Sequence, residues 1–308
     1  MLGYVLKRIL AGLVTMLTLV TLTFFLARAI PGGPFSPAAE RKVPPSVIAL
    51  IEKRYGLDQP VSVQYLKYMG NLLHGDLGVS FQQLDVSVNE IVARGFPVSA
   101  RVGVVATLVS LLFGIPLGVV SALRRGRWLD RASMIFATIG ISVPSFVLTV
   151  LLLYLFAVVL KLLPTFGLTT WKHYLLPVTG LAVAPIAYIA RLMRSSMLEV
   201  MRQDYIRTAR AKGLGEVMVI ARHALRNAIV PVVTYLGPLI ATLLTGSFVV
   251  ERIFSIPGIG RDYVSSIGDR DYAVILGVTI FFGALVVIMN IVVDILYAVI
   301  DPRVKLDD

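Results

Sequence analysis

The chain has 308 residues, of which 57% are hydrophobic and 15% charged, with no cysteine and a formal net charge of +11. Its mean hydropathy of +0.83 excludes a soluble domain, which could not bury this much apolar surface. Solid apolar runs of about twenty residues exclude a spanning β-barrel, whose strands alternate over about ten residues. The absence of cysteine excludes disulfides and thiol chemistry. The composition therefore predicts an all-α integral membrane protein.

Six apolar runs predict six transmembrane helices, allowing for tilt. The first run is similar to a signal peptide, because Lys7 and Arg8 precede it and "ARA" ends it. It is longer than the hydrophobic region of a signal peptide, so we interpret it as an uncleaved anchor. The predicted spans are residues 9–30, 102–123, 132–160, 175–190, 229–250 and 273–300.

Basic residues in short loops predict the orientation, because they resist translocation. With six spans, the two terminal segments, the loop after the second span and the loop after the fourth fall on one side. These segments contain sixteen Lys or Arg residues against seven Asp or Glu residues. We expect this side, with both termini, to be cytoplasmic.

Residues 31–101 are expected to form a large extracytoplasmic element between the first two spans. Pro45 opens one short predicted helix, which continues to residue 55, and Pro60 opens a second over residues 61–73. The second helix is interpreted either as an amphipathic cap on the membrane or the spans, or as an outer vestibule or docking surface for an extracytoplasmic partner. Its predicted apolar face consists of Val61, Tyr65, Tyr68, Met69 and Leu72.

The chain accordingly divides into an N-terminal tail with the first span (residues 1–30), the outer element (31–101) and a five-helix core (102–308). Within the core, residues 251–272 form an outer loop with a Pro-Gly-x-Gly turn. Pro257, Gly258 and Gly260 of that turn are candidates for gating the outer mouth or for a subunit contact, and a simple interfacial connection is the alternative.

The cytoplasmic loop at residues 191–228 is rich in Lys and Arg and has a helical pattern. A predicted helix runs from Ser195 to Lys212 and meets Gly213, which can adopt the left-handed conformation that ends a helix. Gly215 permits a second change of direction. A second helix then follows, whose predicted apolar face is Val217, Ile220, Ala221 and Ala224.

This predicted corner between two helices is small enough for another protein to approach its backbone closely. Ala209, Ala211, Gly213 and Gly215 have little or no side chain. A corner held between two spans is suited to act as a lever. The alternative is a basic loop that fixes the topology and binds anionic lipid headgroups.

Asp294 is the one carboxylate inside a predicted span, and Asn290 shares its helix face. We interpret it as a structural polar contact, a gating or subunit contact, or a coupling-ion site. Prolines at or inside the third, fourth and fifth spans predict kinks that can line a water-filled path. They are Pro144, Pro177, Pro185, Pro231 and Pro238.

Catalytic and metal-binding signatures are absent from the sequence. It contains no GxxxxGK[ST] phosphate loop, HExxH or GxSxG motif, and His74, His173 and His223 are isolated from one another. The sequence therefore predicts a chain that is not an enzyme, binds no metal and has no ATP-binding phosphate loop of its own.

Two stretches of the cytoplasmic loop, "YIRTARAKGL" and "RHALRNAIVP", resemble the permease subunits of ATP-binding-cassette (ABC) importers, in the dipeptide and oligopeptide branch. Ala209 and Gly213 match the family's Glu-Ala-Ala-x-x-x-Gly motif, whereas Arg207 replaces its Glu and Thr208 its first Ala. Other segments extend the resemblance over residues 1–303. They are "PGGPF", "HGDLGVS", "PGIG", "RDY" and "DILYAVIDPR", and the first is most similar to the oligopeptide permease B-type subunits.

The resemblance implies the type I ABC importer permease fold in a bacterial plasma membrane. It implies four kinds of partner besides membrane lipid: a homologous second permease, two cytoplasmic ATPases, an extracytoplasmic peptide-binding protein and the peptide itself, with no role for nucleic acid. ATP and Mg would bind the partner subunits, and no cofactor would bind this chain. The implied contact with the ATPase consists of Thr208, Ala209, Arg210, Ala211, Lys212, Gly213, Leu214, Gly215 and Glu216.

Other functions remain compatible with the residues alone. An ion-coupled secondary transporter would work without an ATPase, and a non-transport scaffold would not depend on the corner. The substrate is expected to be a dipeptide or an oligopeptide, with a nickel chelate or glutathione as alternatives.

Overall fold

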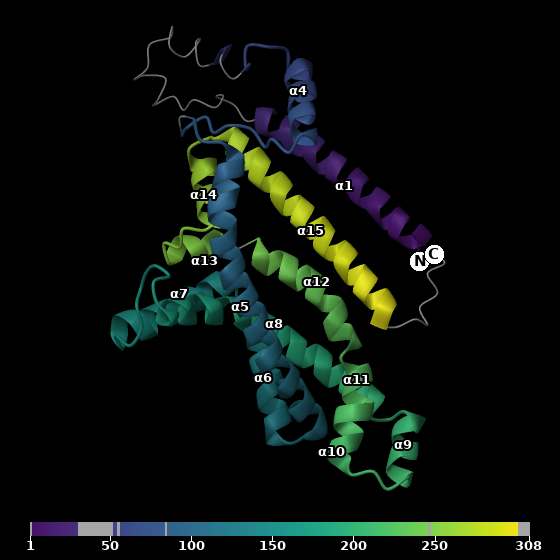
Figure 1. Ribbon diagram of the computed structural model, residues 1–308. Coiled ribbons are helices and arrows are strands. Elements are labelled where there is room, and N and C mark those ends of the chain that lie inside the picture. Colours follow the sequence, from purple (N-terminus) through teal and green to yellow (C-terminus); the bar gives the residue numbers. More distant parts are fainter. Residues whose placement is uncertain (1, 30–51, 54–55, 84, 246–247, 301–308) are drawn as a thin grey trace.

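The computed structural model describes residues 2–29, 52–53, 56–83, 85–245 and 248–300, with the side chains of residues 2–5 and 294–300 left out (Figure 1). The described chain is helical, and five of its helices are long and apolar enough to span a membrane. A bent helix pair supplies a sixth crossing if it is counted as one span. The elements are α1 (Leu2–Ala29), α4 (Val61–Leu73), α5 (Val88–Leu123), α6 (Trp128–Ser142), α7 (Ser145–Leu153), η1 (Tyr154–Val159), α8 (Trp171–Val200), α9 (Asp204–Ala211), α10 (Glu216–Met218), η2 (Val219–Ala224), α11 (Leu225–Ala228), α12 (Val230–Leu244), α13 (Phe248–Ile253), α14 (Ile259–Gly268) and α15 (Tyr272–Ile300).

Two of the spanning helices begin earlier than their apolar runs, because local caps define their starts. The Ser87 hydroxyl accepts a hydrogen bond from the Glu90 backbone N–H at 3.1 Å, so α5 begins at Val88. Helix α8 begins at Trp171, where the ring of His173 and Thr170 form a capping box. It continues to Val200, beyond the end of the predicted fourth span. The prediction of one helix from Ser195 to Lys212 is wrong, because a turn at residues 201–203 separates α8 from α9, which begins at Asp204.

The third predicted span is sharply bent at Pro144, where the sequence predicts a kink. Helices α6 and α7 are bent by 103° relative to each other. The bend lies at Val143 and Pro144, where Val143 has the extended ψ of 123°. Proline cannot donate a helix hydrogen bond, and its ring disfavours a helical conformation for the preceding residue. The apolar run is continuous in sequence, but the helix is not.

Helices α5 and α8 pack along each other and form the centre of the core. Gly118 allows this contact, because a Cβ atom there would lie 2.6 Å from the carbonyl oxygen of Ala190. Met193 and Met197 of α8 are completely buried in the same cluster. Close approach through small residues is the usual basis of helix association in membranes.

The first and last helices, α1 and α15, form an antiparallel pair. Gly12 near the start of α1 lies against Val287 in the second half of α15, whereas Phe24 near the end of α1 clusters with Leu276 near the start of α15. The start of α1 and the end of α15 therefore lie at the same end of the molecule (Figure 1). Helix α1 is otherwise exposed, with Leu13 61% accessible, as expected for a surface that faces lipid or another subunit.

Helix α4 has the bounds predicted from the sequence and covers the end of α1 (Figure 1). Tyr65 and Tyr68 pack against Phe24, and the Arg28 side chain donates to Gln64 Oε1 at 2.6 Å. The other residues of the expected face are partly buried, and Val61 is exposed. These contacts confirm the cap on the spans. The other predicted outer helix lies outside the described residues, apart from residues 52–53, which are helical.

Candidate coupling site and outer turn

The corner between α9 and α10 projects from one end of the molecule, at the bottom of Figure 1. Helix α9 ends at Ala211, and Gly213 has a φ of +79°, which confirms the predicted left-handed conformation. The backbone N–H of Gly213 donates to the carbonyl of Arg210 at 2.9 Å. Gly215 is extended, with a ψ of 146°, and precedes α10.

The inner face of α9 attaches the corner to the helix core. Ile206 is completely buried and Ala209 is 5% exposed, in the same cluster as Met197 and Val219. The side-chain amide of Asn227 donates to the hydroxyl of Tyr205 at 2.8 Å. These contacts join α9 both to α8 and to the helical segment that leads to α12, so a force on the corner reaches both.

The outer face of the corner carries apolar side chains that this chain leaves exposed. Leu214 is 39% exposed, Val217 81% and Met218 48%. Thr208 donates its hydroxyl hydrogen to the carbonyl of Asp204 at 3.0 Å. An exposed apolar group on a projecting tip with a basic surround is typical of a surface that contacts another protein.

The predicted apolar face of the second corner helix is confirmed in part. Ala224 is buried and Ile220 packs against the core, as predicted, whereas Val217 and Ala221 are exposed. The wide turn η2, whose hydrogen bonds connect residues five apart rather than four, interrupts the regular helical spacing within this segment.

An ion pair closes the corner. Arg210 Nε lies 2.7 Å from Glu216 Oε1, and a second guanidinium nitrogen lies 3.3 Å from Oε2. The hydrogen bond from Arg210 lowers the pKa of Glu216, and the same bond raises the pKa of Arg210. Both side chains are exposed, so the pair fixes the shape of the corner more than it stabilises the fold.

The structure brings together the nine residues of the predicted contact in this one corner, with Ala211 and Lys212 also exposed at its tip. Asp294 lies in α15, and its side chain is outside the described residues, so its role stays a prediction.

The outer turn at Pro257, Gly258 and Gly260 lies far from the corner, against α5 and α13. The carboxylate of Glu251, which is 3% exposed, accepts hydrogen bonds from the backbone N–H groups of Gly260 at 2.9 Å and Arg261 at 3.3 Å. Ser99 Oγ of α5 accepts one from the Ile259 N–H at 3.0 Å.

Little space remains around this turn. A Cβ atom at Gly258 would collide with Glu251 Oε2 and Ser99 Oγ, and one at Gly260 would lie 2.9 Å from Glu251 Oε2. The turn is therefore a tightly packed connection between α5, α13 and α14. Sequence reasoning identified its glycines but missed Glu251 and Ser99, because the pairing partners lie on different helices.

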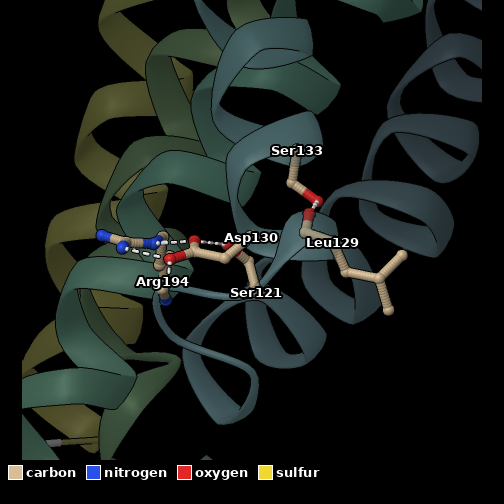
Figure 2. Close-up of polar contacts among 6 residues, drawn as sticks. Ser121, Leu129, Asp130, Ser133 and Arg194 are labelled. Carbon is tan, nitrogen blue, oxygen red and sulfur yellow. Dashed lines mark hydrogen bonds and ion pairs between the residues drawn. The ribbon is translucent and has the colours of Figure 1, made fainter.

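An ion pair between buried Asp130 and partly buried Arg194, which we call the Asp130 clamp, joins α6 to α8 (Figure 2). Arg194 of α8 makes two bonds to Asp130 of α6, with Nε 2.6 Å from Oδ1 and a terminal nitrogen 2.8 Å from Oδ2. The carboxylate also accepts from the Ser121 hydroxyl at 2.5 Å and the Gly126 N–H at 2.8 Å. The clamp consists of these four residues and fixes the turn between α5 and α6 to α8. Sequence reasoning counted Asp130 and Arg194 only as loop charges.

The long apolar helices identify the chain as a membrane protein. The chain belongs to the family of binding-protein-dependent transport system inner membrane components, whose family model matches residues 114–306. A model of the N-terminal part of these membrane components matches residues 1–102. The chain is therefore a multi-pass permease, as the sequence resemblance implied.

Similar proteins cover nearly the whole chain. It is 48% identical over 303 residues to the dipeptide transport system permease protein DppB of Bacillus subtilis, covering 98% of each chain. It is 44% identical over 307 residues to the oligopeptide transport system permease protein OppB of Escherichia coli, covering 99% of this chain and 100% of the relative. It is 42% identical over 305 residues to the glutathione transport system permease protein GsiC of Salmonella paratyphi A, covering 99% of each.

A solved structure confirms the fold class. The structure of the methionine ABC transporter MetNI in inward-facing conformations matches with a TM-score of 0.58 at 20% identity, covering 68% of this chain and 96% of the matched chain. The fold is that of a type I ABC importer permease, and the likeness at this identity concerns the fold alone.

Proposed function

We propose that this chain is the transmembrane permease subunit of an ATP-driven peptide importer and that it transmits closure of the ATPases through the corner. The observation that carries the proposal is the corner itself, which is anchored by buried Ile206 and Ala209 and presents exposed Leu214 and Val217. The similarity to dipeptide and oligopeptide permeases supports a peptide as the substrate. Glutathione, itself a small peptide, is the alternative, because one similar protein is a glutathione transport system permease.

The partners follow from this proposal. A homologous second permease would complete the translocation path, two ABC ATPases would bind ATP and Mg and contact the corner, and an extracytoplasmic binding protein would deliver the peptide. The corner and both termini would then be cytoplasmic, in agreement with the excess of basic residues on that side. The tightly packed outer turn at Gly258 would lie on the opposite side, where it is suited to a gate or a subunit contact.

The mechanism uses the corner as a lever. Closure of the ATPase pair pushes the corner, and the buried contacts of α9 transmit the push to α8 and α12. Shifting the translocation path between two conformations from a population ratio of 1:99 to 99:1 requires a difference in binding free energy of about 5.5 kcal/mol between the two states. A cycle of nucleotide binding can supply this difference, but a static lipid contact cannot.

The contact is tested by co-purification from membranes in mild detergent, with the proteins identified by mass spectrometry. Leu214→Glu and Val217→Glu place charges on the exposed face without altering the left-handed Gly213. The matched control is Leu73→Glu, because Leu73 is 84% exposed on α4 at the other end of the molecule. We expect the parent and the control to retain an ATPase and a second permease, and the corner variants to lose the ATPase.

Two results would contradict the proposal. Retention of the ATPase by both corner variants would show that the contact lies elsewhere. Recovery of the parent alone, or only with itself, would favour an ion-coupled carrier or a scaffold.

A further inference from the structure

A cavity of about 420 Å³ lies among the bent pair α6–α7, α8 and α12. Its lining contains no Lys, Arg, Asp or Glu, which sets it apart from a second cavity of about 350 Å³ that charged Arg125, Glu199 and Arg202 line near the corner. The residues around the larger cavity are Ile141, Ser145, Leu181, Ala184, Pro185, Tyr188, Tyr235, Pro238, Leu239, Thr242 and Leu243.

Three helix irregularities meet at this cavity. Pro185 of α8 and Pro238 of α12 belong to its lining, and the bend at Pro144 lies between the lining residues Ile141 and Ser145. Within a membrane, helix-breaking residues are tolerated where the released backbone groups line a cavity or find other partners. Pro185 has no N–H and cannot donate the usual helix hydrogen bond to the carbonyl of Leu181, another residue of the lining.

Two tyrosines, one from the helix before the corner segment and one from the helix after it, contact each other at the cavity. The rings of Tyr188 in α8 and Tyr235 in α12 have centroids 4.4 Å apart and are inclined by 39°. Tyr188 is 42% exposed and Tyr235 partly buried. Hydroxyl groups and a backbone carbonyl can bind the amide groups of a peptide, and the uncharged wall does not discriminate among side-chain charges.

The position of the ring pair connects it to the corner. Helices α8 and α12 are the two long helices that the corner segment joins, so a change in their separation changes the distance between Tyr188 and Tyr235. The two rings are in contact and both belong to the lining, so they connect the two helices at the wall of the cavity.

We propose that this cavity is a peptide-binding part of the translocation path and that the Tyr188–Tyr235 pair is its constriction. The inference rests on the proposed function and adds the residues that contact the peptide backbone. The occupant is the transported peptide, held by amide hydrogen bonds rather than by a charged side chain.

The test uses single cysteines, because the chain has none of its own. Tyr188→Cys and Tyr235→Cys are introduced separately into the complete transporter, and their reaction with a membrane-impermeant, water-soluble thiol reagent is timed with and without trialanine. The control is Leu151→Cys, because Leu151 is 57% exposed on α7 but does not line the cavity. ATP-dependent uptake of trialanine by the parent is measured first, so that failure of the proposed function is recognised separately.

We expect both tyrosine positions to react faster than position 151. Trialanine at ten times its half-saturating concentration is expected to slow the reaction about tenfold, by simple occupancy. Tyr188→Phe and Tyr235→Phe, which keep the rings, are expected to raise the KM of uptake about fivefold each through loss of one hydrogen bond, with kcat little changed.

The proposal is overturned if uptake is intact and the cysteines react no faster than position 151, because lipid or a helix of the second permease then fills the cavity. It is also overturned if they react but trialanine gives no protection, since the cavity would be wet without binding peptide.

Discussion

Removing Arg194 from the Asp130 clamp is expected to destabilise the chain measurably. Asp130 is 4% exposed and would keep two of its four hydrogen-bond donors, Ser121 and Gly126, after Arg194→Met. Breaking a buried ion pair by removing one partner costs about 3 to 5 kcal/mol. Because half of the donors remain, we expect the lower figure, about 3 kcal/mol.

The assay is thermal unfolding of the purified chain at one fixed scan rate, followed by the helical circular dichroism signal. For a chain of this size about 3 kcal/mol corresponds to a fall of roughly 6 °C in the apparent midpoint. The control is Arg191→Met on the same helix, because Arg191 donates to exposed Thr138 at 3.1 Å and the loss of an exposed contact costs little.

A double-mutant cycle separates the pair from its surroundings. Asp130→Ala combined with Arg194→Met is expected to cost less than the sum of the single changes, by about 1 to 3 kcal/mol. The reasoning is refuted if Arg194→Met lowers the midpoint by less than about 1 °C, the size expected for an exposed pair.

Three further predictions concern backbone conformation, packing and pH. Gly213→Val is expected to lower the free energy of unfolding by about 1 to 2 kcal/mol, because the φ of +79° is unfavourable for a residue with a Cβ atom. The control Gly215→Ala, at a φ of −62°, should be near neutral. Thermal unfolding measures both variants, and equal effects would contradict this account. Gly118→Val is expected to cost at least about 1 to 3 kcal/mol and to lower the yield of folded chain, because a Cβ would lie 2.6 Å from a carbonyl of α8, and Gly70→Ala, with nothing within 4 Å, is the control. The amount of ATPase retained in a pull-down is expected to be constant at pH values above the ordinary pKa of a glutamate. It should fall only as the pH decreases through the lowered pKa of Glu216. Equal acid sensitivity of Glu216→Gln would show that another group is responsible.

Features with a local cause could be predicted from the sequence. Pro60 and the apolar spacing indicated α4, and Gly213 indicated a left-handed helix end. Both depend on residues within one or two helical turns of each other, where backbone preference and side-chain spacing dominate.

Features that depend on contacts between distant residues or on irregular helix geometry could not be predicted from the local sequence. Pro144 indicated a kink, but the angle of 103° depends on how α7 packs against α8. The clamp joins Asp130 to Arg194, and the ring pair joins Tyr188 to Tyr235, across separate helices. The wide turn η2 leaves no sequence signal in the apolar spacing, so Val217 was assigned to the wrong face.

The pairing of α1 with α15 has a consequence for the time course of synthesis. Gly12 emerges from the ribosome about 275 residues before its partner Val287, which at 5 to 20 residues per second is a delay of about 14 to 55 s. During that interval α1 lies in the membrane without its partner. Its largely exposed surface is apolar and is therefore stable in contact with lipid. Helix α15, made after the other described helices, then packs against α1.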